Sequence, residues 1–288
     1  MTYEETTNPL QGIEAHPGSG HYGVFDHGAH VWAYQPDGQQ PVLWMSEKSA
    51  FADGQPIRGG VPVVFPWFGA GPEGRLSPAH GFARLSTWHR SDIKDTIAHD
   101  GRLLVEHRLD DAMTHDHGEF QGRYTAYLLA KFTPEYLQLG MKVTNVGEEP
   151  FTFESAFHTY LAVGDVRQIT IDGLDGCDYL DRAAGAEKLE CRQDGPVTIS
   201  SETDRLYVHK DTVVLNDPVL GRKLEISKLG SANTIVWNPW VAKAAAMADF
   251  GDDEWTGMIC IEAANALDNA IRLLPGQTHT LRQRITLV

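Results

Sequence analysis

The chain has 288 residues, with 24 basic against 39 acidic side chains and a formal net charge of −15. This charge repels phosphate backbones and anionic lipids, so neither nucleic acid nor a membrane is an expected partner. The three cysteines lack CxxC spacing, and no basic leader or long apolar run is present, which predicts a cytoplasmic protein.

Strand-like segments dominate the chain, because apolar and polar residues mostly alternate with a period of two. In residues 137–143, Leu137, Leu139, Met141 and Val143 share one predicted face, and the same alternation recurs in 102–109, 222–229 and 279–288. Only residues 240–250, between a proline and a glycine, favour a helix. Without a linker-like composition break, we predict one large antiparallel β-domain spanning residues 1–288.

Residues 57–69, IRGGVPVVFPWFG, form the first candidate ligand-binding stretch. Because of its prolines, this segment is unfavourable as a central strand. Gly59 and Gly60 let the backbone approach a ligand closely beside the Arg58 guanidinium. A buried loop with an incidental arginine is an equally good interpretation of this segment.

The next stretch, AHGFARLSTW at residues 79–88, contains His80 and Arg84 around a Gly-Phe hinge. Guanidinium groups bind phosphate oxygens in a bidentate manner, so Arg58 and Arg84 could form the local positive pocket that an acidic protein needs for a sugar phosphate. The alternative is that each arginine pairs with one of the many carboxylates.

Two further side chains are candidate proton carriers. His158 lies in ESAFHTYLAVGD, residues 154–165, where it is either a packed core histidine or a catalytic one. Glu262 follows the apolar run 258–261, and at the end of a buried strand its pKa should be raised, as suits a general base. A structural salt bridge is the alternative for Glu262.

The remaining histidines favour no metal site. Neither HExxH spacing nor a cysteine partner accompanies His16, His21, His27 and His30, or His115 and His117, so solvated loops and strand ends are the preferred interpretation. No GxGxxG, P-loop or GxSxG element appears, which removes the usual dinucleotide, nucleotide and serine-hydrolase functions.

An ordered set of segments resembles one known family. IRGGVPVVFPWFG, AHGFAR, MKVTNVGEEPFTFESAFHTYLAVGD, SETDRLY, VWNPW and CIEAANA are, in this order, similar to the hexose-6-phosphate mutarotases of the aldose 1-epimerase (galactose mutarotase-like) family. The resemblance covers nearly the whole chain. It implies an all-β fold, a β-supersandwich of large, mostly antiparallel sheets with an open sugar cleft.

The resemblance also implies roles for individual residues. His158 matches the general acid and Glu262 the general base, while Asp204 matches a position that contacts sugar hydroxyls. Arg58 and Arg84 match positions near the substrate and its phosphate, and His80 is a further substrate-binding candidate. Acid and base together would interconvert the anomers of a hexose 6-phosphate, with D-glucose 6-phosphate as the default, by opening and closing the ring. No metal or redox cofactor is required, and we expect a monomer.

Three other functions remain open from the sequence. A mutarotase of free galactose or glucose would not require two arginines. A glycosidase could pair Glu262 with Asp204 or Glu154, but this leaves His158 without a role. A carbohydrate-binding protein without catalysis could use Trp67, Trp237 or Trp240 as an aromatic platform.

Overall fold

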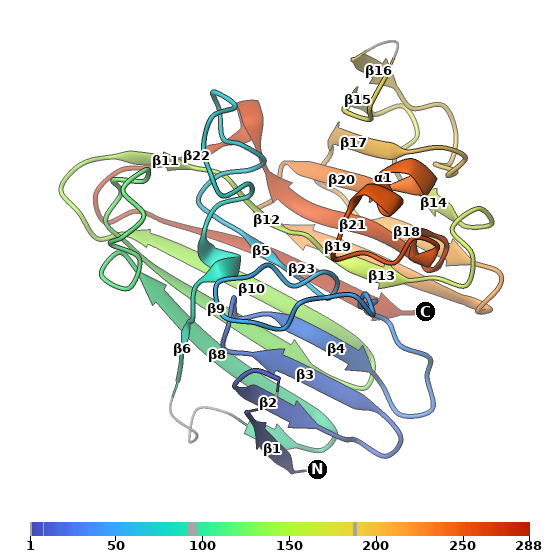
Figure 1. Ribbon diagram of the computed structural model, residues 1–288, viewed down its shortest axis with the longest axis horizontal. Coiled ribbons are helices and arrows are strands. Elements are labelled where there is room, and N and C mark those ends of the chain that lie inside the picture. Colours follow the sequence, from blue (N-terminus) through green and yellow to red (C-terminus); the bar gives the residue numbers. More distant parts are fainter. Residues whose placement is uncertain (1, 8, 92–96, 187–188) are drawn as a thin grey trace.

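The computed structural model of the protein describes residues 2–7, 9–91, 97–186 and 189–288 (Figure 1). Two large sheets account for most of the strands, and their strand pairings are antiparallel. The predicted all-β fold class is therefore confirmed.

The larger sheet has nine strands. Their order is β14 (Thr170–Asp172), β18 (Val213–Asp217), β19 (Arg222–Leu229), β23 (Thr278–Leu287), β10 (Tyr136–Asn145), β9 (Tyr124–Phe132), β8 (Arg102–Asp110) and β6 (His89–Arg90), with β7 (Ile97–His99) also paired to β8. The alternating segments predicted around 102–109, 137–143, 222–229 and 279–288 are all strands of this sheet. On β10 the predicted inward face, Leu137, Leu139, Met141 and Val143, is buried.

The second sheet has eight strands and carries the candidate site. Their order is β16 (Glu190–Arg192), β15 (Asp178–Asp181), β17 (Thr203–Val208), β20 (Asn233–Asn238), β21 (Met258–Asn265), β12 (Ser155–Phe157) and β5 (Val63–Val64), with β13 (Tyr160–Ala162) also paired to β21. All residues of β20 and β21 are buried, because both faces of these central strands are covered.

The two large sheets are joined through polar as well as apolar contacts. Gln283 of β23 accepts a hydrogen bond from Thr159 at 2.5 Å and donates one to the carbonyl of Ile261 at 2.9 Å. Ile261 itself belongs to the main hydrophobic core. One face of β21 is therefore fixed against the nine-stranded sheet, and its other face carries Glu262.

Smaller elements complete the fold. A four-stranded sheet contains β1 (Tyr3–Thr6), β2 (Gly12–Ala15), β3 (His21–Phe25) and β4 (Val31–Gln35), and a two-stranded one contains β11 (Phe151–Phe153) and β22 (Ile271–Leu273). The predicted helix is present as α1 (Trp240–Ala246) but ends earlier than predicted, because Met247 is already extended. Single 3₁₀ turns are η1 (Ala83–Leu85), η3 (Glu254–Gly257) and η4 (Leu267–Asn269). No helix among the described residues is long and apolar enough to cross a membrane.

The glycine- and proline-rich segment 57–69 contributes only the two-residue strand β5, at one edge of the eight-stranded sheet. Gly60 has φ +57°, and a Cβ there would lie 2.4 Å from the carbonyl oxygen of Val31. The expectation that this segment is no central strand is therefore confirmed, and the close approach at Gly60 explains why the chain needs glycine there.

Candidate active site

The two predicted proton carriers lie face to face. His158 occupies the short gap between β12 and β13, and both of these strands pair with β21, which carries Glu262. The His158 Nε2 and Glu262 Oε1 atoms are 3.5 Å apart. One expectation was wrong: Glu262 is not at the end of a strand but in the middle of β21, because the strand continues through small apolar residues to Asn265.

Burial changes the acid strength of both groups. The pKa of His158 lies well below its ordinary value because of burial, and the nearby His80, Arg58 and Arg84 add to the effect. Burial also raises the pKa of Glu262 well above its ordinary value, with a further contribution from the carboxylate of Asp204. In each of the two side chains one buried atom has no hydrogen-bond partner: Nδ1 of His158 and Oε2 of Glu262. The pair can hold and move a proton without competing protein contacts.

His80 is held next to this pair by its own loop. The backbone N–H of Gly69 donates to the ring atom Nδ1 of His80 at 3.2 Å. The backbone N–H of His80 in turn donates to the carbonyl of Gly69 at 2.6 Å. Burial, with help from neighbouring arginines, lowers the pKa of His80 to about 3. A neutral ring that accepts at Nδ1 must carry its proton on Nε2, so His80 can only donate from that atom. Its ring packs edge-to-face on the His158 ring at 5.8 Å.

Arg58 is close to His158 but its charge is already paired. Its guanidinium donates twice to Asp249, at 3.2 Å each, and once to the Tyr160 hydroxyl at 2.9 Å. Tyr160 in turn stacks on the His158 ring, with 4.9 Å between ring centroids. Tyr160 was not predicted, although its position two residues after His158 is a signal that the two could share a side of the strand.

Arg84 differs from Arg58 because it has no carboxylate partner among the described residues. Its Nη2 donates to the carbonyl of Ala79 at 2.8 Å, and its buried Nε atom has no hydrogen-bond partner. Burial lowers the pKa of Arg84, although a guanidinium stays charged at neutral pH. Arg84 therefore brings an uncompensated positive charge to the His158 side of the site.

Asp204 lies on the other side of Glu262. It is directly opposite Trp237 in the β17–β20 pairing, so both side chains belong to the sheet face that carries Glu262. Burial raises the pKa of Asp204, and the nearby Arg182 and Lys243 oppose the shift. Arg182 was not predicted from the sequence, where nothing distinguishes it from other surface arginines. Its guanidinium lies over the Phe68 ring, 5.1 Å from the centroid.

The structure separates the three tryptophans that could form an aromatic platform. Trp237 packs edge-to-face against His158 at 5.7 Å. Trp67, in contrast, is buried in the core against Phe82, and Trp240 packs on Trp255. Only Trp237 among the three touches the predicted site residues.

Glu154 is not available as a second catalytic carboxylate. Its two oxygens accept hydrogen bonds from the backbone N–H groups of Phe68 at 2.9 Å and Leu267 at 2.6 Å. A buried carboxylate with both oxygens engaged in this way orients loops. The glycosidase alternative that would pair Glu154 with Glu262 is therefore not supported by the geometry.

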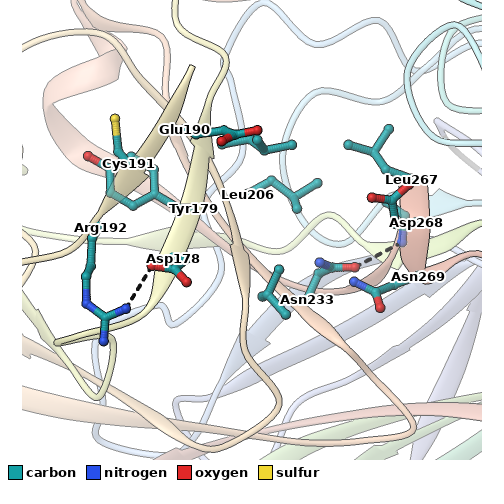
Figure 2. A pocket seen from close by; sticks show the side chains of 13 residues that line it. Asp178, Tyr179, Glu190, Cys191, Arg192, Leu206, Asn233, Leu267, Asp268 and Asn269 are labelled. Carbon is teal, nitrogen blue, oxygen red and sulfur yellow. Dashed lines mark hydrogen bonds and ion pairs between the residues drawn. The ribbon is translucent and has the colours of Figure 1, made fainter. Parts of the chain in front are cut away.

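A pocket of about 490 Å³ lies further along the same sheet face (Figure 2). Its floor includes Leu206, which is directly opposite Ile235, and Ile235 is directly opposite Glu262. Its walls include an ion pair between Asp178 and Arg192, with 3.0 Å between the charged atoms. None of the six predicted site residues lines this pocket, so it is separate from the group around His158 and Glu262.

The fold and this site define a protein whose large antiparallel sheets bring a histidine and a buried glutamate to within 3.5 Å of each other. A family model described as aldose 1-epimerase matches residues 15–286, and the chain belongs to this family.

Individual relatives agree with this assignment. The chain is 34% identical over 244 residues to an Escherichia coli K12 protein named "Putative glucose-6-phosphate 1-epimerase", covering 83% of this chain and 78% of the relative. A protein of the same name from Cenchrus ciliaris is 30% identical over 262 residues, covering 88% and 77%. The crystal structure of "a putative mutarotase" from Salmonella typhimurium superimposes with a TM-score of 0.85 at 25% identity, covering 98% of this chain and 92% of the other.

Proposed function

We propose that this protein interconverts the α and β anomers of a hexose 6-phosphate, with D-glucose 6-phosphate as the expected substrate. The observation that carries the proposal is the opposed pair of His158 and Glu262, 3.5 Å apart and buried beside cationic side chains. The names of the relatives from Escherichia coli and Cenchrus ciliaris support the same substrate.

The proposed reaction needs one proton donor and one proton acceptor. Glu262, as a carboxylate, takes the proton of the C1 hydroxyl while His158, as an imidazolium, protonates the ring oxygen, and the bond between C1 and the ring oxygen breaks to give an aldehyde. Rotation about C1–C2 followed by the reverse transfers closes the ring on the other face. The pair contains one proton before and after each transfer, so no external acid or base is consumed.

The arrangement of the hexose suggests where its phosphate binds. The phosphate is attached through C6 to C5, the carbon that bears the ring oxygen, so it lies on the same side of the sugar as His158. Arg84 offers an unpaired charge on this side, and Arg58 adds a second guanidinium. Asp204 and Arg182 lie on the opposite side of Glu262, towards the C2 and C3 hydroxyls in this pose.

Phosphate binding at this place would also prepare His158 for its role. The charges of Arg58 and Arg84 contribute to the lowered pKa of His158 in the free enzyme. A dianion beside these arginines offsets their charge and raises the His158 pKa again, so the imidazolium needed as the acid is favoured when substrate is bound. A neutral hexose lacks this effect, which favours the sugar phosphate over free galactose or glucose.

We infer a monomer that works as one domain. The free cysteines Cys177, Cys191 and Cys260 fit a reducing cytoplasm. The acidic surface again argues against nucleic-acid partners.

Anomeric exchange of glucose 6-phosphate, followed by magnetisation-transfer NMR, tests the proposal. We expect exchange well above the spontaneous rate for glucose 6-phosphate and slower catalysis for glucose and galactose. Equal acceleration of all three sugars would instead indicate an aldose 1-epimerase of free hexoses. Binding of glucose 6-phosphate with exchange at the spontaneous rate would indicate a sugar-binding protein and contradict the proposed enzyme.

A further inference from the structure

A cluster of possible metal ligands lies on the four-stranded N-terminal sheet. In the β2–β3 pairing Ala15 is directly opposite Tyr22, so His16 and His21 are the next opposed pair beyond the end of β2. Glu14 is two residues before His16 and therefore belongs to the same side of the hairpin. Glu14, His16 and His21 thus share the face opposite to that of Ala15 and Tyr22, which are buried in the core.

The three side chains converge on one point. His21 Nε2 is 3.1 Å and His16 Nε2 is 3.8 Å from the same Glu14 oxygen, Oε2, and the three ligand atoms lie within 4.8 Å of one another. The two imidazole rings stack at 4.6 Å with 19° between their planes. A hydrogen bond between Glu14 and His21 does not by itself explain why the Nε2 atom of His16 also points to Oε2 of Glu14.

His21 is the most restrained member of the cluster. Trp32 packs its edge against the His21 ring at 4.7 Å. Trp32 can take this position because Gly23 has no side chain; a Cβ at Gly23 would lie 2.4 Å from the indole.

A further carboxylate is close by in the sheet. Glu4 of β1 is directly opposite Glu14 of β2, so their side chains share the face on which the histidines lie. Two carboxylates next to two imidazoles place oxygen and nitrogen donors on one face of the sheet.

We propose that Glu14, His16 and His21 bind a divalent transition-metal ion of the Zn²⁺ type. Ligand atoms about 2.0–2.1 Å from a tetrahedral zinc ion are about 3.3 Å apart, so the observed separations require only modest side-chain rotation. Two imidazoles with a carboxylate favour Zn²⁺, Ni²⁺ or Cu²⁺ over Mg²⁺ and Ca²⁺. Glu4 or water can fill a remaining position. This site was not expected from the spacing of the histidines in the sequence.

The metal would tie the end of β2 to the start of β3. It would stabilise the N-terminal sheet and leave catalysis unchanged, because His158 and Glu262 belong to a different sheet. The proposal is therefore independent of the proposed mutarotase activity.

Isothermal titration of the EDTA-treated full-length protein with Zn²⁺ tests the site, together with the visible absorption of a Co²⁺ complex. We expect one ion per chain with nitrogen ligands, and a loss of affinity of about tenfold or more in His16→Ala, His21→Ala and Glu14→Gln. His115→Ala is the matched control. His115 also contacts a carboxylate, that of Asp116, at 3.1 Å, but it does not belong to the cluster of Glu14, His16 and His21.

Two outcomes would overturn the proposal. One is the absence of saturable Zn²⁺ binding to the wild-type protein; the other is equal affinity in the wild type, His16→Ala and His21→Ala. A thermal shift with Zn²⁺ in the wild type and His115→Ala, but not in His21→Ala, would add support. Anomeric exchange in the presence of EDTA is measured alongside, so failure of the metal site is distinguished from failure of the enzyme.

Discussion

Two kinds of buried polar group lie on neighbouring strands of the eight-stranded sheet. Asn238, at the end of β20, donates to the carbonyls of Trp255 and Met258 at 2.9 Å each and accepts from the Trp240 N–H at 2.9 Å. Glu262, buried on β21, and His158, mostly buried between β12 and β13, each keep an atom without a partner. A fully paired group stabilises the fold, whereas an unpaired one costs stability unless a ligand supplies the partner. Among these three residues, the hydrogen-bond pairing differs between the structural group, Asn238, and the two catalytic candidates.

The largest expected effect is on catalysis. Replacing Glu262 by Gln or His158 by Asn removes one proton carrier, and we expect anomeric exchange of glucose 6-phosphate to fall by about 10²–10⁴ in each variant. Thermal unfolding should show no loss of stability, because neither substitution breaks a satisfied hydrogen bond. Exchange within a few-fold of the wild type in both variants would remove the catalytic assignment.

Substitution of Asn238, the fully hydrogen-bonded residue, should lower stability and leave catalysis unchanged. Asn238→Ala leaves the Trp255 and Met258 carbonyls and the Trp240 N–H without their partner, and we expect a loss of about 2–3 kcal/mol in the free energy of unfolding. Urea unfolding measures this loss, and exchange per folded molecule should stay near the wild-type value. An unchanged unfolding free energy would show that pairing does not mark structural groups here.

Arg84 and Arg182, on the two sides of Glu262, allow a matched test of phosphate binding. Arg84→Ala should raise KM for glucose 6-phosphate by about tenfold or more, because a charge-assisted contact to a phosphate contributes about 1.5–3 kcal/mol. It should leave the smaller activity on free glucose unchanged. Arg182→Ala should affect both sugars equally. The reverse pattern would place the phosphate on the Asp204 side of the site.

The pH dependence of stability tests the same two catalytic candidates through the directions of their pKa shifts. The pKa of Glu262 is raised on folding. Its contribution to the free energy of unfolding is therefore fully present below the ordinary carboxyl pKa and is lost as pH rises towards the raised value. Glu262→Gln should therefore gain stability relative to the wild type above about pH 4.3, by up to about 1.4 kcal/mol per pH unit.

The lowered pKa of His158 predicts the opposite direction. Its contribution is present above the ordinary imidazole pKa and is lost as pH falls, so His158→Asn should gain on the wild type below about pH 6.5. Urea midpoints across pH check both signs, with Asn238→Ala as a control that shows neither trend. Parallel pH curves for all four proteins would contradict the assigned directions.

Much of the fold could be predicted from local patterns. The alternation in residues 137–143 predicted both the strand and its buried face, because the side-chain period of a strand is a local property. The length of the helix was overestimated, since the chain turns into an extended conformation at Met247 despite continuing apolar character. The prolines and glycines of 57–69 correctly indicated a segment outside the centre of the sheet.

The candidate site could be predicted only through the ordered motifs. Tyr160 follows His158 at a spacing that a strand pattern can detect, but the ion pair between Arg58 and Asp249 joins residues from distant parts of the chain. Arg182 has no local signal at all. The convergence of Glu14, His16 and His21 depends on hairpin register, which the spacing of the histidines in the sequence does not reveal.

The all-β class, the faces of the main strands and the family could be predicted from the residues alone, because these follow from periodicity and from motif order. The tertiary structure was needed to show that His158 lies 3.5 Å from Glu262 of β21, that the charge of Arg58 is paired while that of Arg84 is not, and that Glu154 orients loops. Such pairings depend on strand register and burial between residues far apart in the chain, and burial also sets which way each pKa moves.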